Sequence, residues 1–200
     1  MTSTRRIGSP DAKSRKLLLN AAEQLMLEEG YAAVSSRNVA RKAGLKYQLV
    51  WYYFRSMDEL FLAVFQRRAE EGLKRQAAIL ASEDPLRELW QFDLDAASSG
   101  ALTIEFAALA NHRNVIRDAL ADYSRRFREA EIEIVRTVLR RYEVDTEQWP
   151  AEVVAFVMAS TSRTMALECA FDMTVAHEET LSFVREHLER LGKLPPEMPA

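Results

Sequence analysis

Residues 36–60 read SRNVARKAGLKYQLVWYYFRSMDEL, and this stretch decides the fold of the N-terminal part of the chain. Its spacing predicts a short helix over residues 36–43 and a second short helix over residues 46–53. Gly44 lies between them and supplies the positive φ that a residue with a Cβ resists. The inner faces carry apolar residues at helical spacing: Val39, Ala40, Ala43, Val50 and Phe54. Two short helices joined by a glycine turn form a helix-turn-helix motif, whose second helix enters the DNA major groove.

Longer helices flank this motif. An apolar stripe predicts a first helix over about residues 13–29, and Gly30 is placed to end it. Ser35 or Ser36 is expected to cap the next helix. Ser56 and Glu59 form a capping box that opens a helix running to about Leu80.

A set of spaced residues in this part of the chain resembles the DNA-binding domain of the TetR family of bacterial transcription regulators. The matching residues are Ala21, Ala22, Gly30, Tyr31, Val39, Ala40, Ala43, Gly44, Trp51, Tyr52, Tyr53, Phe54, Asp58, Glu59 and Leu60. The resemblance covers roughly residues 14–65, and beyond it only the length and the helical layout are similar.

The remainder of the chain also predicts helices, and no stretch alternates with the period of a strand. The expected helices span about residues 85–98, 102–111, 114–142, 150–173 and 178–191. The fold class is therefore all-α with about nine helices. We expect a basic arm over residues 1–11, a helix-turn-helix domain over 12–56, a ligand-binding and dimerisation domain over 57–194, and a tail over 195–200.

Charge is unevenly distributed, although the net charge is only −3. Residues 1–75 carry 14 Lys and Arg against 8 Asp and Glu, whereas residues 76–200 carry 13 against 22. A basic N-terminal part fits an anionic partner at one end of the molecule. The arm could follow DNA or could simply be a solubilising tail. No apolar run is long enough to span a membrane, no secretory signal is visible, and the single cysteine indicates the cytoplasm.

The predicted contacts to DNA lie on the two short helices. Arg37 is the first candidate for a base contact because its guanidinium matches the O6 and N7 atoms of guanine, and Gln48 can pair with adenine. Tyr47 and Leu49 could touch a thymine methyl group or pack on sugar. Backbone positioning is expected from Ser36, Trp51, Tyr52 and Tyr53, although packing is an equal alternative for Trp51 and Tyr52.

Two residues depart from the family pattern. Lys46 stands where the family often has Ser or Thr, and Met57 stands where it often has Lys. Lys46 is a poor helix cap, and its charge opposes the helix dipole. Our hypothesis is that Lys46 makes the phosphate contact that Met57 cannot make.

Several polar residues interrupt apolar stripes in the C-terminal part. They form either an internal ion pair, such as Arg163 with Glu105 or Glu168, or the polar groups of a mostly apolar ligand pocket. The candidate pocket residues are Trp90, Asp93, Glu105, Phe106, Leu109, Met158, Thr161, Met165, Glu168 and Phe171.

The segment over about residues 150–173 is apolar on nearly every side, which indicates a shared interface. The family resemblance implies a homodimer through residues 150–192. It also implies that the protein binds a palindromic operator in double-stranded DNA, most often as a repressor. Binding of a small effector would release the protein from the operator.

An enzyme is the first competing interpretation, and the sequence argues against it. Neither Glu-x-x-His pairs nor a glycine-rich phosphate loop is present, so no cofactor or metal site is expected. Cys169 lies in an apolar helix and is expected in the core. The second alternative is a ligand-binding or scaffold dimer with degenerate DNA binding.

Overall fold

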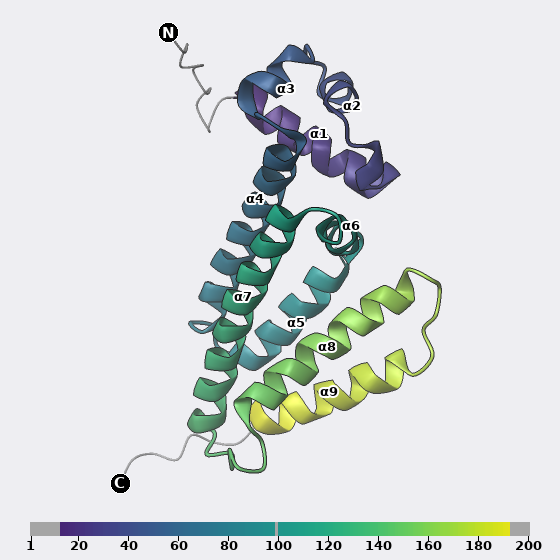
Figure 1. The fold of residues 1–200 in the computed structure, drawn as a ribbon. Helices are drawn as coiled ribbons and strands as arrows, with labels where there is room; N and C mark the ends of the chain where they lie inside the picture. The colour runs from purple at the N-terminus through teal and green to yellow at the C-terminus, as the bar shows by residue number, and fades with distance from the viewer. Residues whose placement is uncertain (1–12, 99, 193–200) are drawn as a thin grey trace. The chain divides into compact units, whose positions relative to one another are not determined.

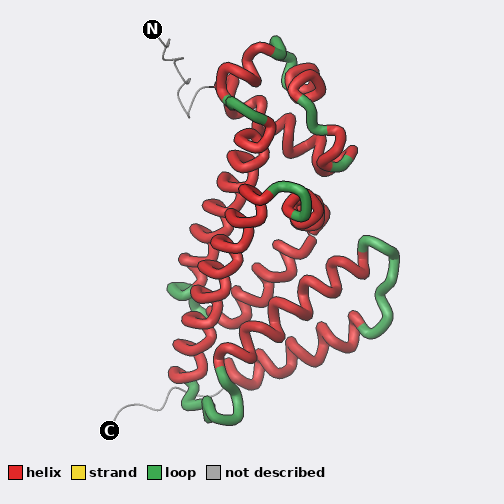
Figure 2. The backbone as a smooth tube through the Cα atoms, viewed as in Figure 1, coloured by secondary structure: helices red, strands yellow, loops and turns green. Residues whose placement is uncertain are grey.

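The computed structural model describes residues 13–98 and 100–192, and in these residues it contains α-helices, one 3₁₀ helix and no strand (Figures 1 and 2). The predicted all-α fold is confirmed. The elements are α1 Lys13–Glu29, η1 Tyr31–Ala33, α2 Ser36–Lys42, α3 Gln48–Tyr53, α4 Met57–Ile79, α5 Pro85–Ser98, α6 Gly100–Ala110, α7 Asn114–Arg141, α8 Ala151–Cys169 and α9 His177–Gly192. The predicted basic arm and the tail over 195–200 lie outside the described residues.

Side chains cap two helices where the sequence predicts it. Ser35 Oγ accepts a hydrogen bond from Asn38 N at 3.2 Å and begins α2. At the start of α4, Ser56 Oγ accepts from Glu59 N at 3.1 Å, while Glu59 reaches back to the N–H of Arg55 at 2.7 Å. Each cap satisfies an N–H group that has no partner within its own helix.

Two helices are shorter than predicted, and backbone turns explain both differences. The N–H of Leu49 donates to the carbonyl of Lys46 at 3.0 Å in a tight turn, so α3 begins only at Gln48. At the other end of the chain, Asp172 adopts a φ of 57° and ends α8 before residue 173. The left-handed residue turns the chain back, so that the N–H groups after it can reach the last carbonyls of the helix. Here the N–H of Met173 donates to the carbonyl of Glu168 at 3.0 Å.

The helices pack into two compact units. One unit comprises the described chain up to Glu71 together with Ala101–Tyr123, and the other comprises Gly72–Gly100 and the chain from Ser124 onward. α6 and the first part of α7 therefore pack with the N-terminal helices. The domain boundary that the sequence analysis expects after residue 56 does not anticipate this arrangement. The N-terminal core includes Leu18, Leu25, Val39, Val50, Phe54, Leu60, Phe106 and Ile116. The C-terminal core includes Leu86, Leu89, Trp90, Val135, Val138, Ala155 and Leu188.

No helix within the described residues is long and apolar enough to cross a lipid bilayer.

Candidate nucleic-acid interface and C-terminal polar sites

The helix-turn-helix geometry follows from three buried residues and one glycine. Val39 of α2, Val50 of α3 and Phe54 after α3 are each at most 1% exposed, so the two short helices share one core with α1. Gly44 has a φ of 66°, which confirms the predicted turn. The chain reverses direction there without the steric cost that a Cβ would add.

The opposite side of α3 is left open to solvent. Trp51 and Tyr52 follow Gln48 by three and four residues, and all three side chains are exposed. Tyr47, just before the helix, is 51% exposed. Large aromatic residues rarely stand uncovered in a group on a small domain, so this face is a candidate contact surface.

The other predicted DNA contacts divide into exposed and partly packed residues. Arg37 and Lys46 are exposed, and no described residue pairs with either charge. Leu49 and Tyr53 pack partly against the N-terminal core, and Ser36 is half-buried in the first turn of α2. The structure therefore leaves Arg37 and Lys46 available to an anion, whereas Leu49 and Tyr53 also have a packing role.

Met57 has a structural explanation. Its side chain packs against the N-terminal core at the first residue of α4, so an apolar residue there contributes to folding. Beside it, Asp58 forms an ion pair with Arg113, which closely follows α6. The start of α4 is thereby attached to the segment between α6 and α7.

Glu105 does not act as a free pocket residue. Its carboxylate accepts a hydrogen bond of 2.6 Å from the backbone N–H of Tyr31, at the turn between α1 and α2. Gly30 lies directly against it, since a Cβ there would stand 3.5 Å from Glu105 Oε2. The φ of 80° and ψ of 164° at Gly30 belong to a region that only glycine readily adopts. α6 therefore holds the turn that precedes α2 and α3.

Replacing Glu105 with alanine is expected to destabilise the N-terminal unit by about 1–3 kcal/mol, because the N–H of Tyr31 loses its acceptor. Glu105→Gln keeps an acceptor oxygen and should cost less. Urea unfolding of the two variants and the parent protein measures the difference. Equal stability of all three would show that this hydrogen bond does not hold the turn.

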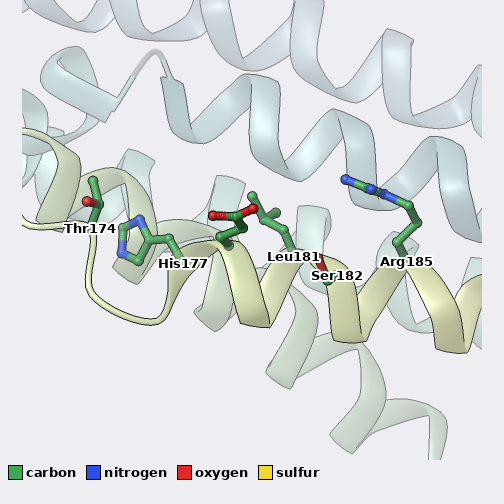
Figure 3. A pocket seen from close by; sticks show the side chains of 6 residues that line it. Thr174, His177, Leu181, Ser182 and Arg185 are labelled. Carbon is green, nitrogen blue, oxygen red and sulfur yellow. The ribbon is translucent and has the colours of Figure 1, made fainter.

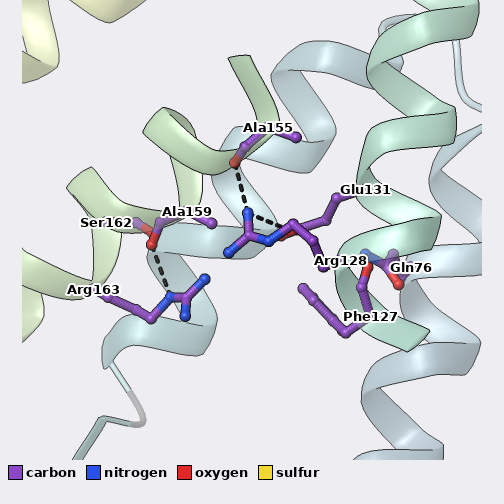
Figure 4. A network of polar contacts seen from close by, with 8 residues as sticks. All are labelled: Gln76, Phe127, Arg128, Glu131, Ala155, Ala159, Ser162 and Arg163. Carbon is purple, nitrogen blue, oxygen red and sulfur yellow. Dashed lines mark hydrogen bonds and ion pairs between the residues drawn. The ribbon is translucent and has the colours of Figure 1, made fainter. Parts of the chain in front are cut away.

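A polar cluster lies inside the C-terminal unit (Figure 4). Asp93 of α5 is 6% exposed and Glu131 of α7 is 1% exposed. Arg128 Nη1 lies 2.9 Å from Glu131 Oε2 and also donates to the carbonyl of Ala155 at 2.8 Å.

A fully buried Gln76 donates to the carbonyl of Phe127 at 3.1 Å. The sequence alone does not identify Glu131, Arg128 or Gln76 as members of this cluster. Each lies near charged residues on a long helix, a pattern typical of a face exposed to solvent.

Burial shifts the titration of both carboxyl groups. Burial raises the pKa of Glu131 to about 8, the charge of Asp93 acts in the same direction, and Arg128 opposes it. Burial also raises the pKa of Asp93 to about 6, although Glu131, Arg163 and Arg128 lower it. At neutral pH the pair therefore retains a proton, and the negative charge in the core is reduced.

The predicted ion pair of Arg163 with Glu168 is not formed, and the carboxylate of Glu105 accepts its hydrogen bond from Tyr31 within its own unit. Arg163 Nε donates to the carbonyl of Ala159 in its own helix at 2.9 Å. Glu168 instead contacts His177 Nε2 at 2.7 Å. The sequence could not reveal this contact, because the loop between α8 and α9 brings the two residues together.

The structure distributes the predicted pocket residues over several places. Glu105, Phe106 and Leu109 belong to the N-terminal unit, where Phe106 and Leu109 are buried in the core. Trp90, Asp93 and Met158 are buried in the C-terminal unit. Thr161, Met165 and Glu168 line one groove of about 450 Å³ with the start of α9. Phe171 is 72% exposed, beyond the end of α8.

The expectation that Cys169 belongs to the core is wrong. Its side chain is exposed at the last residue of α8, because the core of the C-terminal unit ends before that point. Among the described residues, no group of three or more His, Cys, Asp or Glu is arranged to hold a metal ion.

The described residues thus combine a helix-turn-helix motif, whose α3 has an exposed face, with a second helical unit. Comparison with known proteins tests the family resemblance. Residues 18–64 match the family model described as bacterial regulatory proteins, tetR family. The match covers 47 of the 200 residues and agrees with the resemblance of this part of the chain to the TetR family.

Two relatives match over a longer stretch. The transcriptional regulator PksA of Bacillus subtilis is 30% identical over 119 residues, which cover 55% of this chain and 58% of PksA. The regulator BetI of Rhizobium meliloti is 30% identical over 124 residues, covering 57% of this chain and 60% of BetI. The matches thus span about three fifths of these relatives.

A solved structure extends the likeness to the whole fold. The crystal structure of a transcriptional regulator of the TetR/AcrR family aligns with a TM-score of 0.73 at 17% identity, covering 88% of this chain and 98% of that one. At this identity the comparison shows the fold. The fold of this chain is therefore similar to that of the solved regulator over most of both chains.

Proposed function

We propose that this chain is a homodimeric DNA-binding transcription regulator, and that it acts as a repressor released from a palindromic operator by a small, largely apolar effector. The observation that carries the proposal is the open face of α3, where Gln48, Trp51 and Tyr52 stand exposed beside unpaired Arg37 and Lys46 within the described residues. Polar and aromatic groups on a short second helix fit the edges and sugars of a major groove.

Homodimerisation is supported by an uncovered apolar stripe on α8. Val153, Phe156 and Val157 are 55–62% exposed at helical spacing, and Phe183 of α9 is 62% exposed. Apolar side chains of this size in one stripe indicate a surface that another protein covers. A second copy of this chain is the occupant we propose, because a two-fold dimer presents two recognition helices to a two-fold DNA site.

The effector is proposed to bind in the C-terminal unit. A mostly apolar core with a few convergent polar groups is typical of small-molecule sites, and here Asp93, Glu131 and Arg128 are those groups. A ligand can shift the protein away from DNA only by as much as it binds the two states differently.

Selection of bound duplexes from random double-stranded DNA tests the proposal. We expect a two-fold sequence whose half-sites lie about one helical turn apart. Arg37→Ala should weaken binding to that sequence by about tenfold or more and relax the preference at one base pair of each half-site. Arg140→Ala, an exposed arginine of the C-terminal unit, is the matched control. Recovery of only weak, sequence-independent, salt-sensitive binding would instead support a ligand-binding or scaffold dimer.

Lys46 gives a separate prediction. If Lys46 contacts a phosphate, Lys46→Ala should reduce the slope of the logarithm of affinity against the logarithm of salt concentration by about 0.9 per protomer. The sequence preference should remain, because a phosphate contact does not read bases. Filter binding at several salt concentrations measures the slope, and an unchanged slope would refute the phosphate contact.

A further inference from the structure

The junction of α8 and α9 aligns a thiol, an imidazole and a carboxylate. His177 Nε2 lies 2.7 Å from Glu168 Oε2, and the other ring nitrogen, Nδ1, lies 3.7 Å from Cys169 Sγ. His177 is the first residue of α9, and Figure 3 shows it beside Thr174 of the preceding loop. The two nitrogens thus contact different partners, as in a nucleophile–base–carboxylate triad, rather than converging on one point as metal ligands would.

The carboxylate determines which nitrogen of the ring is free. An ionised carboxylate can only accept hydrogen bonds, so the Nε2 of His177 carries the proton shared with Glu168. In the neutral imidazole the remaining nitrogen, Nδ1, then has a lone pair directed to the sulfur of Cys169. His177 is therefore oriented to take the proton of the thiol.

The thiol is open to a reagent, and the proposed dimer contact does not use its side of α8. Cys169 is exposed. It follows Met165 by four residues and Ser162 by seven, so it lies on the side of α8 that is buried earlier in the helix, beyond the point where the core ends. Phe156 and Val157 belong to the other side of the helix, where they are 62% and 55% exposed.

Two grooves adjoin the imidazole, since His177 lines both of them, whereas Cys169 itself lines neither. One, of about 450 Å³, is lined by Glu168 and His177 together with Thr161, Met165 and Val175. The other, of about 440 Å³, is lined by His177, Leu181 and Arg185 among others (Figure 3). These volumes lie in the range of small-molecule sites, and the mixed lining suits a short apolar body with a carbonyl group.

We propose that Cys169 is a covalent modification site for small α,β-unsaturated carbonyl compounds. The proton of the thiol moves to His177 Nδ1, and the sulfur forms a bond to the β-carbon of the compound. The π electrons of the carbon–carbon double bond shift toward the carbonyl oxygen to give an enolate. The imidazolium, stabilised by Glu168, returns the proton to the α-carbon, so the net reaction is an addition without an oxidant or a leaving group.

The test uses the full chain and methyl vinyl ketone, with intact mass spectrometry to follow the adduct. The chain has one cysteine, so C169S defines any background on other residues. The same protein unfolded in urea supplies the rate of an unassisted thiol. We expect the native thiol to react at least about tenfold faster than the unfolded one, since a positioned base contributes that much or more.

Three further variants separate assistance by His177 from mere exposure. His177→Gln should lower the native rate to that of the unfolded protein, and Glu168→Gln should give an intermediate rate with the imidazole still present. His187→Gln is the matched control, because His187 lies further along α9 and contacts the carbonyl of Phe183 at 2.8 Å. Circular dichroism checks that each variant is folded. A native rate no higher than the rate in urea, or a His177→Gln rate equal to the parent rate, would overturn the proposal. None of these outcomes depends on DNA binding.

Discussion

Glu131→Gln is expected to stabilise the C-terminal unit at pH 8 and above, and to flatten the dependence of its stability on pH. Glu131 is 1% exposed on α7, and its pKa rises from the ordinary value of 4.5 to about 8, mainly because of burial. Glutamine has nearly the same shape and cannot ionise. The variant therefore avoids the cost of a buried charge at alkaline pH.

The sign follows from the two states of the chain. In the unfolded chain the carboxyl group loses its proton near pH 4.5, whereas in the folded chain it keeps the proton to about pH 8. Between these values the folded state binds more protons, so stability falls as pH rises, by up to about 1.4 kcal/mol per pH unit for one group. Asp93, with its pKa raised to about 6, adds to the fall in the same direction. Relative to alkaline pH, the extra stability from protonated Glu131 is complete below about pH 4.5, the pKa in the unfolded chain. It is lost as the pH rises to about 8, the pKa in the folded chain.

Urea unfolding of the C-terminal unit at pH 5, 6.5 and 8.5 measures this prediction. The parent protein should lose stability over that series, and Glu131→Gln should lose much less. Glu133→Gln is the matched control, because Glu133 lies on the same helix with a side chain 57% exposed. If the parent and Glu131→Gln show parallel pH profiles, the buried carboxyl group does not titrate as inferred.

Phe156→Glu is expected to convert the protein to a monomer and to lower operator affinity by about 10²-fold or more. Phe156 is 62% exposed on α8, between Val153 and Val157, in the stripe that we propose a second copy covers. A carboxylate in that stripe would place a charge among the apolar side chains of the interface, and Arg128, whose guanidinium lies 5.3 Å from the centroid of the Phe156 ring, would offset only part of that cost. The loss of affinity follows because two linked DNA-binding modules bind by about 10²–10⁴-fold more tightly than one.

Analytical ultracentrifugation and operator titration test the two parts of this prediction. Leu27→Glu is the control, since Leu27 is an apolar residue of α1, 46% exposed and outside the stripe. We expect Leu27→Glu to remain dimeric. A Phe156→Glu protein that stays dimeric would move the interface elsewhere, and a monomer with full affinity would show that the DNA site needs only one copy.

Local patterns in the sequence were sufficient for much of the fold. The spacing of Val39, Val50 and Phe54, the glycine at position 44 and the capping box at Ser56 each depend on residues a few positions apart. Such features survive in almost any tertiary context, because helix caps and left-handed turns are satisfied by neighbouring backbone groups. For the same reason the helix-turn-helix could be predicted as a motif.

The candidate sites were predicted less completely, because they depend on distant partners. Glu105 looked like a pocket residue on an apolar stripe, yet its partner is Tyr31, 74 positions away. Glu131 stands among charged residues in the sequence of α7, and only packing against α5 buries its carboxyl group. Periodicity identifies which side of a helix is apolar, but it does not identify what covers the polar side.

Residues 36–60 illustrate both contributions. By itself the sequence determined two short helices, a glycine turn and a capped helix, since these need only local hydrogen bonds and local apolar spacing. Tertiary structure decided that Met57 packs against the core, that Glu105 holds the preceding turn, and that Gln48, Trp51 and Tyr52 remain uncovered. The physical reason is that burial and pairing are properties of residues brought together by the fold, and no local pattern records them.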